Sequence, residues 1–202
     1  MSSIERVASQ VAGASTVLVL RPQSARLGDV ECKGALVERP NEVELLGVSF
    51  SQPPGVWYDE WVEALGTAPD AAAVITTPEL ADGGLGDRDL DVETVASPSN
   101  LTGIGVKSTS YLSRWDDALA VVESLTVPLQ YADTQSVYKF LHVLTTRLQA
   151  TGAAGQFYLD PTVETDRTVE LFKTLFDAVV ECEVDIDGDD PTVEWSVTLR
   201  DA

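Results

Sequence analysis

Short apolar runs alternate with amphipathic segments over most of the chain. The runs are rich in Val, Leu, Ile and Ala, which is typical of strands in a sheet that is buried on both faces. The predicted strands are residues 16–20, 42–50, 71–76, 92–95, 119–122 and 156–159. Between them, apolar residues recur three or four positions apart, as on the buried side of a helix. The predicted helices are 3–11, 27–37, the segment with Trp57, Trp61 and Leu65, 101–114, 137–148 and 169–179.

The end of the chain has a different pattern. Residues 181–186 and 192–199 alternate polar and apolar side chains with period two, and the Asp-Gly-Asp-Asp-Pro of 187–191 is typical of a hairpin turn. Strand and helix alternate before this point, so we predict an α/β fold with a mostly parallel sheet, helices on both faces and a C-terminal antiparallel hairpin. Residues 78–89 are predicted to form the longest loop. With no repeat or linker, residues 1–202 are predicted to form one domain.

The composition is that of a globular domain. The chain has 202 residues, and 44% of them are hydrophobic, which is enough for a buried core. No apolar run is long enough to span a membrane and the N-terminus does not resemble a signal peptide, so we expect a cytoplasmic protein without membrane contact. Cys32 and Cys182 lack the spacing of a zinc site and are predicted to be packed thiols. We expect no metal and no cofactor.

The charge is strongly negative. There are 33 acidic against 13 basic residues, a formal net charge of −20, and scattered Lys and Arg disfavour nucleic-acid binding. The acidic residues are distributed through the segments, as in 87–91, which indicates adaptation of the whole surface. Such a surface resembles that of proteins from extreme halophiles, in which molar salt shortens the Debye length to about 3 Å and screens self-repulsion.

In open parallel sheets, ligands bind beyond the carboxyl ends of the strands. The segment after the first strand occupies the position of a phosphate loop, which needs glycines, a Lys for phosphate and a Ser or Thr for Mg²⁺ in register. Arg21, Gln23, Ser24 and Gly28 stand there without that pattern. The fifth strand ends at Glu123 and Ser124, where a nucleotide hydrolase would place an Asp. A simpler interpretation is that Glu123 and Ser124 only cap a buried strand.

Together with the helix and strand that follow, the hydrophobic run ending in Glu123 and Ser124 resembles the RecA-like ATPases, among them KaiC-like and RadA-like proteins. The resemblance covers about residues 14–199, and segments 97–105 and 138–145 are similar to an uncharacterised haloarchaeal family of RecA-like proteins. It implies a RecA-like three-layer α/β/α fold. It also implies that the Walker A motif is lost at 21–28 and that Ser51 stands where these ATPases place a water-activating Glu.

The resemblance therefore implies a pseudo-ATPase, a non-catalytic domain that acts as a regulatory or scaffolding protein through protein contacts or self-association. An alternative is a nucleotide- or anion-binding sensor without hydrolysis. Its ligand loop would follow the fourth strand and open the next helix, where a helix N-terminus can bind an anion. Its candidate residues are Asn100, Thr102, Gly103, Gly105 and Lys107. In the structural interpretation of this loop, Ser99 or Asn100 caps the helix and the glycines permit close packing.

Two other features have more than one interpretation. Trp57 and Trp61 lie one helical turn apart, and they either pack on the sheet or form a partner-binding surface. The single His142 lies on a predicted helix without a paired Ser or Cys nucleophile, which disfavours a catalytic triad.

Overall fold

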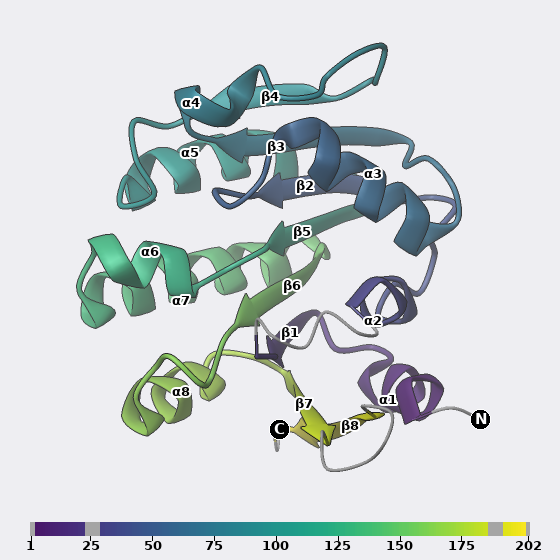
Figure 1. The fold of residues 1–202 in the computed structure, drawn as a ribbon, viewed down its shortest axis with the longest axis vertical. Helices are drawn as coiled ribbons and strands as arrows, with labels where there is room; N and C mark the ends of the chain where they lie inside the picture. Colours follow the sequence, from purple (N-terminus) through teal and green to yellow (C-terminus); the bar gives the residue numbers. More distant parts are fainter. Residues whose placement is uncertain (1–2, 23–28, 186–191, 201–202) are drawn as a thin grey trace.

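The computed structural model describes residues 3–22, 29–185 and 192–200. Within these residues, eight strands form one sheet in the order β4-β3-β2-β5-β6-β1-β7-β8 (Figure 1). The strands are β1 (Thr16–Leu20), β2 (Glu44–Val48), β3 (Ala71–Thr76), β4 (Asp91–Thr94), β5 (Ala118–Val122), β6 (Ala154–Leu159), β7 (Ala178–Asp185) and β8 (Thr192–Leu199). Neighbouring strands are parallel except β7 and β8, which are antiparallel. The predicted α/β fold with a C-terminal hairpin is confirmed.

Helices cover both faces of the sheet. One core lies under α1 (Ser3–Val11), α2 (Asp29–Ala35) and α3 (Pro54–Leu65). The other lies under α5 (Leu101–Leu112), α6 (Thr126–Tyr131), α7 (Thr134–Thr151) and α8 (Asp166–Lys173), while the short α4 (Pro78–Ala81) lies against β4. All five residues of β1 are buried, and so are those of β5, because each of these strands is covered on both faces.

Three details of the predicted elements are wrong. The helix predicted over 169–179 ends at Lys173, and Val179 is a buried residue of β7 paired with Leu18 of β1. Apolar residues keep helical spacing across the turn between α8 and β7, but the β-branched residues at the start of β7 are buried on both faces of the sheet, which favours a strand. Segment 78–89 includes α4, and α6 was not predicted at all. The predicted turn 187–191 lies outside the described residues.

The parallel register brings four strand ends to one edge of the sheet. Leu20 of β1 is aligned with Leu159 of β6, and Val122 of β5 is aligned with both Phe157 of β6 and Val48 of β2. The residues that follow these strands therefore leave the sheet side by side. This edge is where a ligand crevice is expected in an open parallel sheet.

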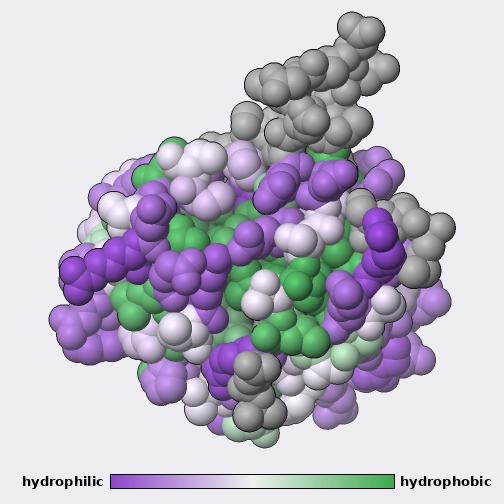
Figure 2. Space-filling model, turned by 90° about the horizontal axis from the view of Figure 1, so that it is seen from below, coloured by the Kyte–Doolittle hydropathy of each residue, from purple (hydrophilic) through white to green (hydrophobic). Residues whose placement is uncertain are grey.

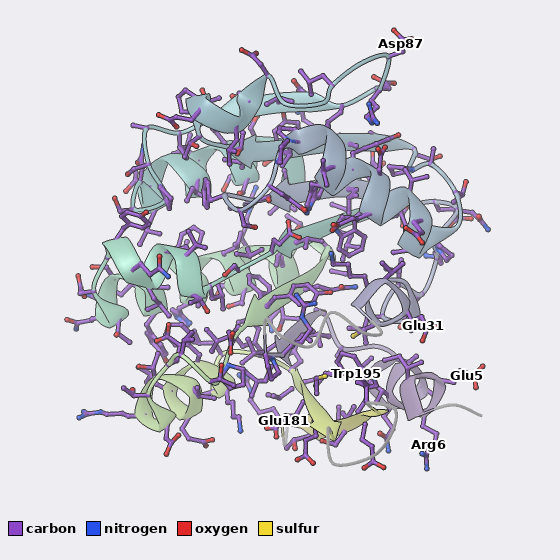
Figure 3. The ribbon with its side chains drawn as sticks, in the orientation of Figure 1. Glu5, Arg6, Glu31, Asp87, Glu181 and Trp195 are labelled. Atoms are coloured by element: carbon purple, nitrogen blue, oxygen red, sulfur yellow. The ribbon has the colours of Figure 1, made fainter. Side chains whose placement is uncertain are left out.

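Charged side chains project from the surface, as Glu5, Arg6, Glu31 and Asp87 show (Figure 3). Seen from the β8 edge of the sheet, hydrophilic residues surround a hydrophobic middle (Figure 2). Cys32 and Cys182 are buried, as predicted. No helix among the described residues is both long enough and apolar enough to cross a bilayer.

Candidate functional site

A cavity of about 550 Å³ opens at the carboxyl ends of β1, β5 and β6. Parts of α2, α3 and the turn after β2 also border it. Its lining residues are Arg21, Val30, Ser51, Gln52, Glu60, Glu63, Glu123, Ser124, Tyr158, Leu159 and Asp160. Four of these side chains are carboxylates and one is a guanidinium, so the lining is acidic.

A lysine reaches the rim of this cavity from the interior. The Lys33 side chain is 2% exposed, and its Nζ lies 3.2 Å from Glu60 Oε2 and 3.5 Å from Glu123 Oε1. Gln52 Nε2 donates hydrogen bonds to the same two oxygens, at 3.1 and 3.0 Å. Because a buried charge is tolerated only when it is paired, this network holds the carboxylate of Glu123 at the end of β5.

The approach of α2 to α3 places this lysine. A Cβ atom on Gly34 would lie 2.0 Å from the carbonyl oxygen of Ala64, so only glycine permits the contact between the two helices. The Lys33 Nζ also lies 5.8 Å from the centre of the Trp61 ring, within cation–π range. Close packing of these helices therefore carries a charged group into a buried position beside Glu60.

Other polar groups around the cavity have partners within the protein. The Arg21 guanidinium carbon lies 5.7 Å from the centre of the Tyr158 ring. Asp160 Oδ1 accepts hydrogen bonds from the backbone N–H and the hydroxyl of Thr162, at 2.8 and 2.6 Å. Burial, and then the negative charge of Asp160, raise the pKa of Glu164. The site is thus an organised acidic network.

The structure brings some of the predicted site residues together. Arg21, Ser51, Glu123 and Ser124 line one cavity, as expected from their places after the strands. Ser124 Oγ accepts a hydrogen bond from the backbone N–H of Val127 at 3.4 Å, which supports the capping interpretation for that side chain. The predicted Gln23, Ser24 and Gly28 lie outside the described residues.

Sequence reasoning missed Lys33, Gln52, Glu60 and Asp160. One signal was available for the lysine. Lys33 lies three residues after Val30 and four before Val37, on a row of the predicted helix 27–37 that is otherwise apolar. A charge on such a row indicates a buried ionic partner, although it does not identify that partner.

The alternative ligand loop lies elsewhere. It follows β4, which is an edge strand separated from β1 by four other strands. Asn100 Oδ1 accepts a hydrogen bond from the Gly103 N–H at 3.0 Å, and Lys107 Nζ is paired with Glu93. The Gly105 position faces Phe140 of α7, not the sheet. The helix N-terminus is capped by its own Asn100, while the exposed Thr102 sits on the first turn of α5.

The two tryptophans do not form a surface. Trp57 and Trp61 are both 0% exposed and belong to the core under α3. Gly47 of β2 makes room for Trp57, since a Cβ atom there would lie 2.3 Å from the Trp57 ring. The partner-surface interpretation of Trp57 and Trp61 is wrong, and packing on the sheet is correct.

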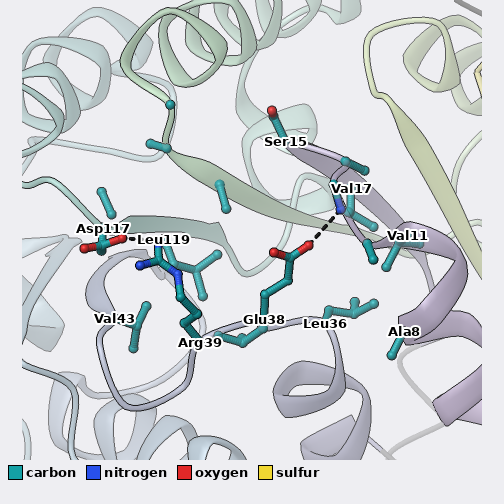
Figure 4. A pocket seen from close by; sticks show the side chains of 18 of the residues that line it. Ala8, Val11, Ser15, Val17, Leu36, Glu38, Arg39, Val43, Asp117 and Leu119 are labelled. Atoms are coloured by element: carbon teal, nitrogen blue, oxygen red, sulfur yellow. Dashed lines mark hydrogen bonds and ion pairs between the residues drawn. The ribbon is translucent and has the colours of Figure 1, made fainter.

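A second cavity, of about 230 Å³, lies at the opposite edge of the sheet, where β1 and β5 begin (Figure 4). Glu38 Oε1 accepts a hydrogen bond from the Gly13 N–H at 2.7 Å, and Arg39 pairs with Glu42 and Asp117. The charged side chains that line this cavity thus form hydrogen bonds and ion pairs within the protein. Among the described residues, no three His, Cys, Asp or Glu side chains are grouped so that they could hold a metal ion.

Comparison with solved structures identifies the fold. The uncharacterized protein PH0321 from Pyrococcus horikoshii, solved in complex with an unknown peptide, matches with a TM-score of 0.62 and 11% identity over 98% of this chain and 90% of that one. The KaiC-like protein PH0186 from Pyrococcus horikoshii matches with a TM-score of 0.58 and 8% identity over 92% of this chain and 78% of that one. These similarities show a RecA-like, KaiC-like fold.

A comparison with curated proteins found no match. A family model, in contrast, matches residues 14–182, which include the acidic cavity and the strands that form its edge. The chain therefore belongs to DUF7504, a family of unknown function.

Proposed function

We propose that this chain is a non-catalytic RecA-like domain, a pseudo-ATPase that acts through protein contacts as a regulatory or scaffolding protein in an extreme halophile. The observation that carries the proposal is the ion pair between the buried Lys33 and Glu123. The acidic group at the end of β5 is the one that a nucleotide hydrolase would use to hold the Mg²⁺ shell. Here a positive charge of the protein already neutralises it.

Metal binding at this position would require a rearrangement. Mg²⁺ takes oxygen ligands at about 2.0–2.1 Å in nearly octahedral geometry. Glu123 Oε1 is within 3.5 Å of Lys33 Nζ and accepts a hydrogen bond from Gln52, while Ser124 Oγ accepts one from Val127. A cation would have to displace the ammonium group, which would then lose one of its two carboxylate partners. A buried charge that loses part of its pairing is unfavourable.

The charge around the cavity also opposes a nucleotide. In the part of the chain that the structure describes, Glu60, Glu63, Glu123 and Asp160 line it together with the guanidinium of Arg21. A triphosphate would meet mostly like charge, and the segment 21–28 has no Gly-Lys-Ser/Thr sequence to offset the repulsion. Both features favour a domain that has kept the fold and lost the nucleotide chemistry.

A role in protein contacts fits the same set of observations. A fold alone does not determine a function, and a RecA-like sheet without nucleotide chemistry remains a stable framework for recognition. The similar structure of PH0321 contains a bound peptide of unknown identity. By analogy, we place this chain among proteins that act by binding other proteins.

Calorimetric titration tests the proposal against the nucleotide sensor. Wild-type protein is titrated in multimolar KCl with Mg-ATP, ADP and cyclic dinucleotides, because the acidic surface is expected to need salt. The expected result is no heat above dilution with each ligand. Saturable binding of any of them would contradict the proposal. If binding were lost in Lys107→Ala but not in Glu123→Ala, the ligand would be assigned to the first turns of α5 and the residues before them.

A further inference from the structure

One face of the molecule departs from the acidic character of the rest. Helices α5 and α7 have 12 and 18 residues and contain no Asp or Glu, although 33 of the 202 residues of the chain are acidic. The gap extends beyond the helices, to 95–115 and 134–159. The prediction that acidic residues occur through all segments is therefore wrong for these two stretches.

These two helices lie side by side. Arg147 Nη2 of α7 donates a hydrogen bond at 2.7 Å to the hydroxyl of Ser113, the residue after α5, and Gly105 of α5 faces Phe140 of α7. We call their solvent-facing side the α5–α7 face. It includes Val106, which is 66% exposed, and Val143, which is 68% exposed. Among the described residues, no other large hydrophobic side chain is as exposed as these two.

Hydroxyl groups and a few basic side chains lie on the same helices as the two valines. Exposed neighbours on the same helices include Thr102, Thr109, Ser136 and Thr146, together with Lys139 and His142. Several cations nearby are engaged within the chain. Lys107 pairs with Glu93, and the Arg114 guanidinium carbon lies 4.8 Å from the centre of the Tyr111 ring. The face is thus rich in hydroxyl groups, has exposed aliphatic side chains and carries basic residues, but its two helices contain no carboxylate.

We infer that the α5–α7 face is the interface of a symmetric dimer, in which it packs on the same face of a second copy of this chain. Each copy carries a net charge of −20, so two copies repel each other wherever carboxylates meet. Contact between this face and an acidic surface would also desolvate carboxylates. Pairing the α5–α7 face with itself avoids both penalties, because the helices of neither copy contribute an acidic residue.

In this dimer the two-fold axis passes near Val143. Such an interface uses the same patch on both copies, so Val143, next to the axis, meets its equivalent, while Val106 packs on other residues of the facing α5–α7 face. Depletion of charge and enrichment of apolar groups are typical of an interface core. The contact would persist in molar salt, which screens ion pairs and strengthens apolar burial.

This inference rests on the part of the proposed function that assigns the chain a role through protein contacts, and it is independent of whether nucleotide binds. Light scattering coupled to size exclusion, in multimolar KCl, measures the mass of wild type and of Val143→Glu. The matched control is Val163→Glu, because Val163 is 63% exposed outside these helices. We expect a dimer for wild type and the control, and a shift of at least tenfold toward monomer for Val143→Glu. Circular dichroism checks that the variants are folded.

Cross-linking tests the symmetry with a second readout. In Val143→Cys, oxidation is expected to give a covalent dimer, since Cys32 and Cys182 are buried, whereas Val163→Cys is expected to stay uncross-linked. A wild-type protein that is monomeric at high protein concentration would overturn the inference. A Val143→Glu protein that remains as dimeric as the wild type would also overturn the inference, because the two copies would then have to meet through another surface, such as the β8 edge.

Discussion

Replacing Lys33 by Met tests the network at the end of β5. The substitution removes the ammonium group but keeps most of the buried aliphatic chain. It leaves Glu60 and Glu123, which both contact Lys33 Nζ, facing each other without a positive charge between them. We expect the variant to fold with reduced stability.

The size of the effect follows from the burial of the three groups. Removing one partner of a fully buried ion pair destabilises a protein by about 3–5 kcal/mol. The Glu60 side chain is 36% exposed and is partly solvated, whereas the Glu123 side chain is 13% exposed. The lower end of the range, about 3 kcal/mol, is therefore expected. For a chain of this length it corresponds to a decrease in Tm of about 6–12 °C.

Thermal unfolding followed by circular dichroism at a fixed KCl concentration measures this decrease. The matched control is Lys173→Met, whose side chain is 28% exposed and pairs with Glu170 and Glu181. An exposed pair contributes about 1 kcal/mol or less. The double variant Lys33→Met/Glu123→Gln is expected to recover about half of the lost stability, because the unpaired charge is removed. If Lys33→Met melts within 2 °C of wild type, or if the double variant recovers nothing, the reasoning is refuted.

Three further results are expected. The Tm of the wild type should rise steeply between low and molar KCl because salt screens a net charge of −20, and a Tm independent of KCl would contradict this. Gly34→Ala should lower the free energy of unfolding measured in urea by about 1–3 kcal/mol, since the new Cβ atom would lie 2.0 Å from the carbonyl oxygen of Ala64. Gly105→Ala should be tolerated better, because a Cβ atom there would lie 3.9 Å from the Phe140 ring. Burial first, and then the hydrogen bond to Asp91, raise the pKa of Tyr111. The neutral Tyr111 phenol therefore stabilises the fold below pH 10, the ordinary pKa of tyrosine, and this stabilisation declines above pH 10. Between pH 9.5 and 11, the melting temperature of Tyr111→Phe should therefore fall less than that of the wild type. An equal fall of the two melting temperatures would contradict this expectation.

The sheet was largely predictable because its central strands are buried on both faces. Strands β1, β3 and β5 each appear in the sequence as one apolar run, and the predicted bounds agree with the structure to within one residue. The end of α8 was not predictable in this way. Phe172, Phe176 and Val179 have helical spacing, yet Val179 is placed by its pairing with β1, a contact between residues far apart in the sequence.

The site was predictable only as far as strand order determines it. Arg21, Glu123 and Ser124 follow strands whose carboxyl ends meet, so their approach could be expected from the sequence. The position of Lys33 depends on the contact between Gly34 and Ala64, which joins two helices. Periodicity identifies the apolar side of each helix but not the residue that it meets. For the same reason, the spacing of the tryptophans indicated a helix without showing that both are buried.

The rate of ATP hydrolysis in multimolar KCl tests the proposed loss of catalysis most directly. Phosphate release is measured with Mg-ATP for wild type and for Glu123→Ala, with Glu63→Ala as a control that also removes a carboxylate from the cavity lining. We expect all three proteins to release phosphate at the background rate. Turnover by the wild type that is abolished in Glu123→Ala and retained in Glu63→Ala would contradict the account, because it would show that the carboxylate at the end of β5 still serves an ATPase.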